Sequence, residues 1–143
     1  MFLGEYQHSV DEKGRIVMPS KFRERLEQGA VVTKGQERCL YVFPADRWET
    51  EVAKVSRLPR TNRTNRNYAR SFFGGASDLA MDKQGRLPIP QALRSYAGLE
   101  KEVVVVGVSD RLEIWDATSW QSLSSQADEL YAGIEEALSE EGI

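Results

Sequence analysis

The alternation of apolar and polar positions predicts that much of the chain forms short strands. Six segments have the alternating or β-branched character of strands: 5–10, 30–33, 40–43, 78–81, 103–108 and 112–115. We expect segment 40–43 to pair with 30–33, and segment 112–115 to pair with 103–108, each pair being joined by a turn. In each half a proline, Pro19 or Pro90, precedes a short amphipathic segment that stops at Gly29 or Gly98, which predicts one brief helix per half.

Three longer segments carry apolar residues at helical spacing: 44–58, 62–73 and 120–138. In the first of them, Trp48, Val52 and Val55 recur every three or four positions. The second ends at a Gly-Gly pair, and the third is acidic and amphipathic. These patterns predict helices between and after the strand-rich parts of the chain.

The chain contains an internal repeat. Segment 11–19 aligns with segment 82–90 at a constant offset of 71 residues, and both read Asp-x-x-Gly-Arg-x-x-x-Pro. The match continues from Phe22-Arg23 onto Leu93-Arg94, and it resumes at an offset of 72 in the strands and tryptophans that follow. A unit of about 45 residues is near the size below which a chain rarely folds alone. We therefore expect the two units to share one core.

The repeat predicts an α+β fold that is mainly β. Two pseudo-symmetric units would form one β-barrel-like body, with helices between and after them. The expected organisation is unit 1, a helical basic connector, unit 2 and an acidic C-terminal helix or tail, at residues 5–47, 48–75, 76–119 and 120–143. Pro88 lies inside a strand-like segment, so that strand is expected at an edge or a bulge.

Composition bounds the class of protein and its compartment. The chain has 41% hydrophobic and 29% charged residues, which is typical of a globular domain. No apolar run approaches the roughly 20 residues that cross a bilayer, and no secretory signal is visible. The single cysteine, Cys39, excludes an intramolecular disulfide and agrees with a reducing compartment. We expect a cytoplasmic protein with no membrane partner.

The formal net charge of −3 conceals a strong segregation of charge along the chain. Up to Trp115 there are 19 Lys and Arg against 15 Asp and Glu, whereas residues 116–143 contain 7 acidic residues and no basic one. The body is mildly basic and the tail is acidic. The net charge therefore does not exclude a nucleic-acid partner.

The two Asp-x-x-Gly-Arg turns are the first candidate for function. Asp at the first position and Gly at the fourth are typical of a type I turn followed by a left-handed residue, a common hairpin connection, so Asp11 and Asp82 are expected to shape the turns. A guanidinium beside such a turn can bind a phosphate or a guanine edge. The alternative is a solvated surface arginine. Because the turn has no obvious structural need for arginine in both copies, the repetition favours a shared role.

Several motifs, taken in order, resemble the MraZ family of bacterial transcriptional regulators, which have tandem AbrB-like (SpoVT-AbrB) domains. They are the N-terminal Met-Phe-Leu-Gly, the two turns, and Phe-Gly-Gly-Ala-Ser at 73–77, and the resemblance extends from Met1 to about Tyr131. It implies a swapped-hairpin barrel, a ring-like homo-oligomer and a location on the nucleoid. It also implies binding to double-stranded promoter DNA, at short direct repeats upstream of the division and cell-wall gene cluster, generally as an autorepressor.

Carried over residue by residue, the resemblance assigns DNA binding to both turns: Arg15, Arg86, Lys13, Lys83, Gly14 and Gly85. The arginines make the contacts, the lysines are flanking cations and the glycines shape the tips. The turns differ, because Glu12 aligns with Lys83 and Lys13 aligns with Gln84. Equal contributions are therefore not expected: either the first turn contacts DNA less, or Glu12 points away or accepts from a cytosine amine.

The connector between the units carries a basic stripe. Residues 52–77 include no acidic residue, while cations recur every three or four positions: Lys54, Arg57, Arg60, Arg63, Arg66 and Arg70. Pro59 interrupts any single helix here. Three interpretations stay open: the stripe pairs with the acidic tail of the same or a neighbouring subunit, it is a solvated face, or it binds DNA phosphates.

Other classes of function have less support in the sequence. No nucleophile with a base, metal cluster or phosphate-binding glycine loop is visible, so we expect no enzyme activity, cofactor, metal or small-molecule substrate. The remaining alternatives are an AbrB-like antitoxin, whose acidic tail would bind a partner protein, and a ring-forming protein-interaction module. The aromatic residues are expected in the core or a subunit interface, His8 in a structural role, and Cys39 as a buried inert thiol.

Overall fold

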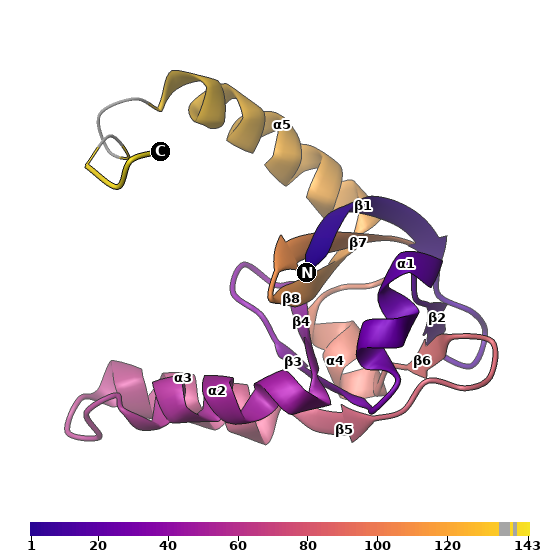
Figure 1. Ribbon diagram of the computed structural model, residues 1–143, viewed down its shortest axis with the longest axis horizontal. Helices are drawn as coiled ribbons and strands as arrows, with labels where there is room; N and C mark the ends of the chain where they lie inside the picture. Colours follow the sequence, from indigo (N-terminus) through magenta and orange to yellow (C-terminus); the bar gives the residue numbers. More distant parts are fainter. Residues whose placement is uncertain (135–137, 139) are drawn as a thin grey trace.

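The computed structural model of the chain describes residues 1–134, 138 and 140–143 (Figure 1). Its strands are β1 (Phe2–Ser9), β2 (Arg15–Val17), β3 (Ala30–Lys34), β4 (Leu40–Pro44), β5 (Ser77–Leu79), β6 (Arg86–Pro88), β7 (Glu102–Ser109) and β8 (Arg111–Asp116). Its helices are α1 (Ser20–Arg23), the 3-10 helix η1 (Glu24–Leu26), α2 (Ala45–Ser56), α3 (Arg63–Gly74), α4 (Gln91–Tyr96) and α5 (Ala117–Gly133). The predicted extension of the last helix to residue 138 reaches positions outside those described.

The predicted α+β class is confirmed, with an antiparallel sheet at its centre. Six strands follow the order β1-β7-β8-β4-β3-β5, and β2 and β6 form a separate two-stranded ribbon. Over the described residues the large sheet has two edges, β1 and β5, so it is open and does not close into a barrel. The ribbon contains Pro88, has no further strand on either side within the described residues, and packs over the core.

Strands are exchanged between the two sequence units. β1 of unit 1 pairs with β7 of unit 2 over eight residues, and β5 of unit 2 pairs with β3 of unit 1. The turn after β1 therefore does not lead into the local two-stranded hairpin that the sequence suggested, and a single bridge, Val10 to Ile16, remains of it. Pairing with β7 is much longer than the three residues that β2 could offer, and it also buries Phe2.

The core is shared by both units. Ile16 of β2 and Leu87 of β6 lie opposite each other and are fully buried. Phe22 of α1 packs edge to face on Phe2 and Tyr6 of β1, with ring centroids 5.2 and 5.3 Å apart. Further buried members come from both halves of the chain: Met18, Leu26, Val32, Leu40, Leu93, Val105, Leu112 and Ile114. Neither unit can form this core alone, as the size of the units suggested.

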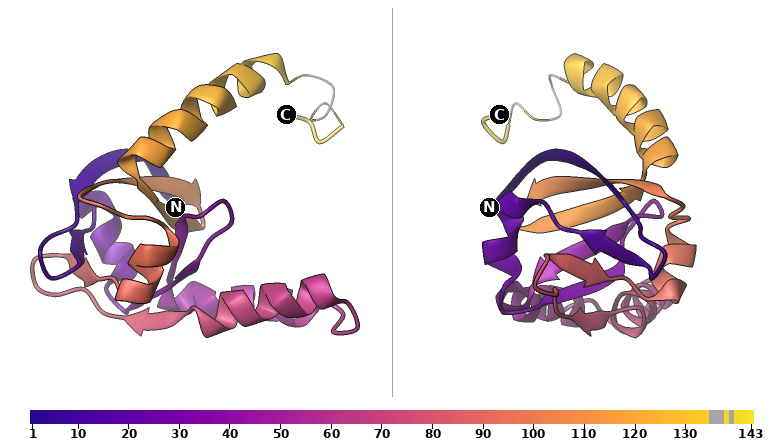
Figure 2. Two further views of the ribbon diagram at one scale, coloured as in Figure 1. Left: turned by 180° about the vertical axis from the view of Figure 1, so that it is seen from behind. Right: turned by 90° about the vertical axis from the view of Figure 1, so that its right-hand side faces the viewer.

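The longer helices lie outside the core. α2 and α3 form a hairpin, held to the sheet by a second apolar cluster in which the rings of Trp48 and Phe72 stack at 5.2 Å. Asn62 caps α3 by accepting from the backbone N–H groups of Thr64 and Asn65. α5 begins beside β8, where the ring of Trp120 lies 5.7 Å from that of Trp115. In Figure 2, left, α5 leaves the top of the body and the α2–α3 hairpin lies at its bottom, and both extend beyond the body in the same direction.

Cys39 precedes β4 and is 1% exposed. Burial raises the pKa of its thiol to about 12. Because the thiolate is the reactive form, we expect alkylation by iodoacetamide at pH 8 to be slow in the folded protein and at least tenfold faster in urea, as measured by mass spectrometry. Equal rates in the two states would contradict a buried thiol.

Candidate nucleic-acid interface

The first turn is organised around one carboxylate. Oδ1 of Asp11 accepts hydrogen bonds from the backbone N–H groups of Lys13 and Arg15, both at 2.9 Å, and Oδ2 accepts from Nε of Arg15 at 2.8 Å. Gly14 closes the turn by donating to the Asp11 carbonyl at 3.0 Å, with a φ of 78° that favours glycine. The hydrogen bond from the Arg15 backbone, followed by that from its side chain, lowers the pKa of the Asp11 carboxyl below its usual value.

The second turn has the same geometry. Oδ1 of Asp82 accepts from the backbone N–H groups of Gln84 and Arg86 at 2.9 Å, and Oδ2 accepts from Nε of Arg86 at 2.6 Å. Gly85 has a φ of 77° and donates to the Asp82 carbonyl at 3.0 Å. The Arg86 backbone hydrogen bond likewise lowers the pKa of this carboxyl. The repeat in sequence is thus a repeat of one turn structure.

The ribbon places the two arginines on one face. Arg15 lies opposite Pro88, and Arg86 lies opposite Val17. Side chains alternate along strands, and since Ile16 and Leu87 point into the core, Arg15 and Arg86 point the other way. Two residues of strand rise and one strand spacing separate their Cα atoms by about 8 Å. In Figure 2, right, β2 and β6 face the viewer.

Each guanidinium is oriented by the turn through its Nε atom alone. The side chains of Arg15 and Arg86 are 27% and 29% exposed, and each uses only Nε in its ion pair with Asp11 or Asp82. Among the described residues, the Nη atoms of both arginines have no hydrogen-bond partner. A planar fork held in this way can bind a phosphate or the O6 and N7 atoms of guanine.

Two further arginines, Arg23 and Arg94, lie beside the turns, although the sequence alone assigned them no role. Nε of Arg23 donates to the Met18 carbonyl, and Nε of Arg94 donates to the Ile89 carbonyl, each at 3.0 Å. The guanidinium of Arg23 lies against Gly85 of the other unit, where a Cβ atom would overlap it. Arg94 lies against Gly14 in the same way.

This arrangement connects each unit to the turn of the other. The sequence contained the necessary indication, because Arg23 and Arg94 align at the repeat offset of 71. That match extends the repeat, but on its own it does not show that the two arginines reach the turns. Together with Arg15 and Arg86, they place four guanidinium groups in or beside the two turns. Arg23 also contributes, after burial, to the lowered pKa of His8.

The flanking residues of the turns are exposed. Lys13, Lys83 and Glu12 all lie at the surface, and none of them forms an ion pair with another described residue. The first turn therefore exposes the carboxylate of Glu12 at the position where the second turn exposes the cation of Lys83. The unequal contribution of the two turns stays a prediction.

The basic stripe of the connector lies on the α2–α3 hairpin. Only Lys54 among its six cations forms an ion pair within the described residues, with Glu51 at 3.3 Å. No ion pair joins the stripe to the described part of the acidic tail. In Figure 1 the hairpin extends away from β2 and β6, so it lies at the opposite end of the molecule from the turns. The stripe and the turns do not form one surface.

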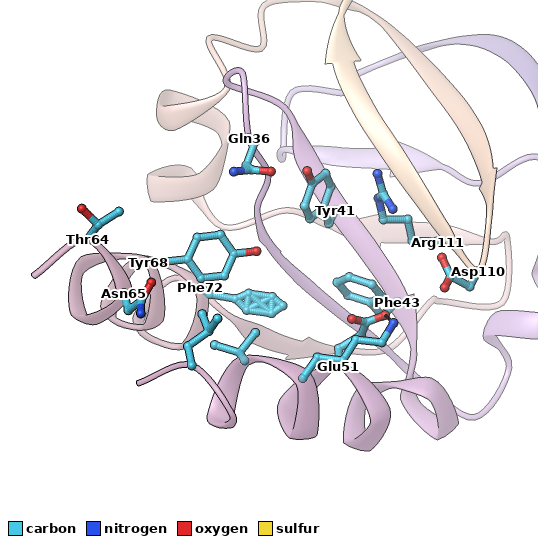
Figure 3. A pocket seen from close by; sticks show the side chains of 13 residues that line it. Gln36, Tyr41, Phe43, Glu51, Thr64, Asn65, Tyr68, Phe72, Asp110 and Arg111 are labelled. Atoms are coloured by element: carbon cyan, nitrogen blue, oxygen red, sulfur yellow. Dashed lines mark hydrogen bonds and ion pairs between the residues drawn. The ribbon is translucent and has the colours of Figure 1, made fainter. Parts of the chain in front are cut away.

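A cavity of about 540 Å³ opens between the hairpin and the sheet (Figure 3). Its floor is aromatic, with Tyr41, Phe43, Tyr68 and Phe72, and its polar lining includes Glu51, Lys54, Asp110 and Arg111. The guanidinium of Arg111 lies 4.5 Å from the centre of the Tyr41 ring and donates to Glu113 at 2.8 Å. Charges of both signs thus balance one another around this cavity.

Neither a metal site nor a membrane span is visible in the described residues. No group of three or more of their His, Cys, Asp or Glu side chains comes together as a metal site would require. No helix in the described part of the chain combines the length and apolar character needed to span a membrane.

Comparison with known proteins gives matches over the whole chain. A family model described as "MraZ protein, putative antitoxin-like" matches twice, over residues 1–71 and 72–140. The protein named "Transcriptional regulator MraZ" from Acetivibrio thermocellus is 48% identical over 143 residues. Proteins of the same name from Desulfitobacterium hafniense and Clostridium tetani are each 46% identical. Each alignment covers all of both chains.

Proposed function

The chain belongs to the MraZ family, and from that membership we propose that it is a sequence-specific DNA-binding transcriptional regulator. The observation that carries the proposal is the pair of matching turns, which hold Arg15 and Arg86 on one face with their outer nitrogens available. Relatives of equal length are named as transcriptional regulators. In this proposal Arg15 and Arg86 read base edges in a groove, and Lys13 and Lys83 neutralise phosphates beside them.

The target that we propose follows from the family resemblance. The protein acts as an autorepressor at short direct repeats upstream of the division and cell-wall gene cluster, and it is located in the cytoplasm on the nucleoid. One chain presents few contacts, so we propose a homo-oligomer, in the form of a ring, that binds several repeats at once. Linked weak contacts give useful avidity when the spacing of the DNA repeats matches that of the subunits.

A binding titration tests the proposed function. The protein is titrated with DNA from upstream of its own gene and with a shuffled sequence of equal length, at two salt concentrations. We expect at least tenfold tighter binding to the upstream DNA, and a log–log salt slope of about −0.9 for every phosphate neutralised. Equal binding to both DNAs, or no binding, would contradict the proposal. Binding that ignores the spacing of the repeats would contradict the multivalent part alone.

Arg23 and Arg94 are expected to contribute phosphate contacts. Their side chains lie beside the turns but are held to backbone carbonyls through Nε, so their outer nitrogens can bind phosphate oxygens. Arg23→Ala and Arg94→Ala are each expected to weaken binding to upstream and shuffled DNA by a similar factor, and to reduce the salt slope by about 1 for each phosphate that is no longer neutralised. An unchanged slope in both variants would show that these arginines only support the turns.

A further inference from the structure

The free end of α5 carries an apolar stripe that the described part of the chain does not cover. Leu123, Ala127 and Leu130 recur at spacings of four and three residues and therefore follow one side of the helix, and Ile134 comes directly after its last residue. Leu130 is 70% exposed, and the adjacent Tyr131 is 78% exposed. The helix is attached to the body at its first turns and has no buried residue. Contiguous exposed apolar surface of this kind is typical of an interaction site.

A groove of about 300 Å³ lies on the α2–α3 hairpin, and we call it the hairpin groove. Its apolar lining includes Leu58, Ala69 and Phe73, and its basic lining includes Arg60, Arg66 and Arg70. Arg66 and Arg70 donate only to neutral acceptors, the Arg60 carbonyl and the Asn67 side chain. Within the described residues, no carboxylate pairs with any of the three arginines.

The charges of both helices oppose their own dipoles. α3 begins with Arg63 and has no acidic residue in its first turn, although a helix N-terminus favours negative charge. α5 carries Asp128 and Glu129 near its C-terminal end and has no basic residue in its last turn, although that end favours positive charge. Contact between the acidic end of α5 and the basic hairpin would relieve both conflicts.

Among the described residues of one chain α5 and the hairpin are held apart, since α5 lies at the top of the body and the hairpin at its bottom (Figure 2, left). The larger cavity of Figure 3 is a poorer seat for an acidic helix, because Glu51 and Asp110 line it. The hairpin groove combines apolar lining with uncompensated positive charge. It therefore matches an apolar helix end that carries acidic residues.

We propose that the free end of α5 in one copy docks into the hairpin groove of a second copy. The contact uses two different surfaces, so it is heterologous: repeated from copy to copy, it closes into a ring or continues as a filament. This inference rests on the homo-oligomer of the proposed function, and it assigns the subunit contact to particular elements. It gives the basic stripe and the acidic tail a common role.

The test uses two double variants of the full chain. The helix variant, Leu130→Ser with Tyr131→Ser, removes the apolar docking residues, and the groove variant, Arg66→Glu with Arg70→Glu, reverses the charge of the groove. Arg38→Glu with Lys101→Glu is the matched control, because both residues are exposed cations outside the groove. Sedimentation velocity without DNA measures assembly, and circular dichroism verifies folding. All the altered side chains are at least partly exposed, so the fold should be retained.

We expect the wild type and the control to assemble, and each variant alone to dissociate at concentrations at least tenfold higher than the wild type does. The groove variant still has an intact α5, and the helix variant still has an intact hairpin groove. In an equimolar mixture these two surfaces can make one contact, so the mixture should form one-to-one dimers. Wild-type assembly in either variant, a mixture without dimers, or a monomeric wild type would overturn the proposal. A monomer that still selects upstream DNA would overturn this inference and the proposed homo-oligomer but leave the proposed DNA binding intact, whereas an assembled protein without DNA selectivity would overturn the proposed DNA binding alone.

Discussion

Replacing Arg15 or Arg86 by alanine is expected to weaken binding to upstream DNA by about tenfold or more while binding to shuffled DNA changes much less. A bidentate arginine contact with a base contributes roughly 1–3 kcal/mol of discrimination. Every subunit of an oligomer that engages the DNA carries the same substitution, so the measured effect grows with the number of engaged subunits. Fluorescence anisotropy with both DNAs, at one fixed salt concentration, gives the ratio of affinities directly.

The matched control for this experiment is Arg38→Ala. Arg38 is an exposed arginine in the turn between β3 and β4, where it donates to the Tyr96 carbonyl. It carries the same charge as Arg15 but lies outside the ribbon, so its removal should leave the selectivity for upstream DNA unchanged. Equal losses of affinity in all three variants would mean that net charge alone drives binding. Full selectivity in both turn variants would reduce the turns to a structural role.

Lysine at the same positions separates charge from geometry. Arg15→Lys and Arg86→Lys keep the cation but lose the planar fork that the Asp11 and Asp82 carboxylates orient. If the planar fork reads bases, the lysine variants should bind shuffled DNA as the wild type does but should not recover the selectivity for upstream DNA. Restored selectivity would show that a positive charge at these positions is sufficient and that the planar fork is not required.

The sequence predicted those features that depend on local chemistry. The turns follow from Asp and Gly at fixed positions, because the Asp carboxylate accepts from backbone N–H groups two and four residues later and Gly14 adopts a positive φ. The repeat itself predicted two such turns and one shared core. The α2 and α3 segments follow from helical spacing of apolar residues, and Asn62 provides the cap.

Strand exchange could not be predicted from the same patterns. A turn that closes with good geometry normally joins two strands of one hairpin, and only the pairing of β1 with β7 shows that the strands diverge after Val10. Whether β1 pairs with β2 or with β7 depends on the tertiary structure, because β1 pairs with the strand that offers the longer antiparallel register. The repeat offset marks Arg23 and Arg94 as a matching pair, but it could not predict their contacts, because each lies against a glycine of the other unit, about 60–80 residues away in sequence.

Gly107→Ala is expected to lower the free energy of unfolding by about 1–3 kcal/mol, the typical cost of forcing extra volume into a closely packed site. Gly107 of β7 pairs with Gly4 of β1, and Gly4 has a φ of 97°, a backbone conformation that favours glycine. A Cβ atom on Gly107 would overlap backbone atoms of Phe2 and Leu3. Backbone cannot rotate away as a flexible side chain can, so β1 must shift and withdraw Phe2 from the core.

The matched control for this glycine is Gly74→Ala. Gly74 ends α3 with no atom within 4 Å of its Cβ position, so alanine there should be neutral or stabilise by up to about 1 kcal/mol. Urea denaturation followed by circular dichroism and by tryptophan fluorescence measures both variants. Because β1 and β7 belong to different units, Gly107→Ala should lower the midpoint of one common transition for both probes. A separate early transition would show that the units unfold independently, and an unchanged midpoint would show that β1 does not bind β7 as closely as the register requires.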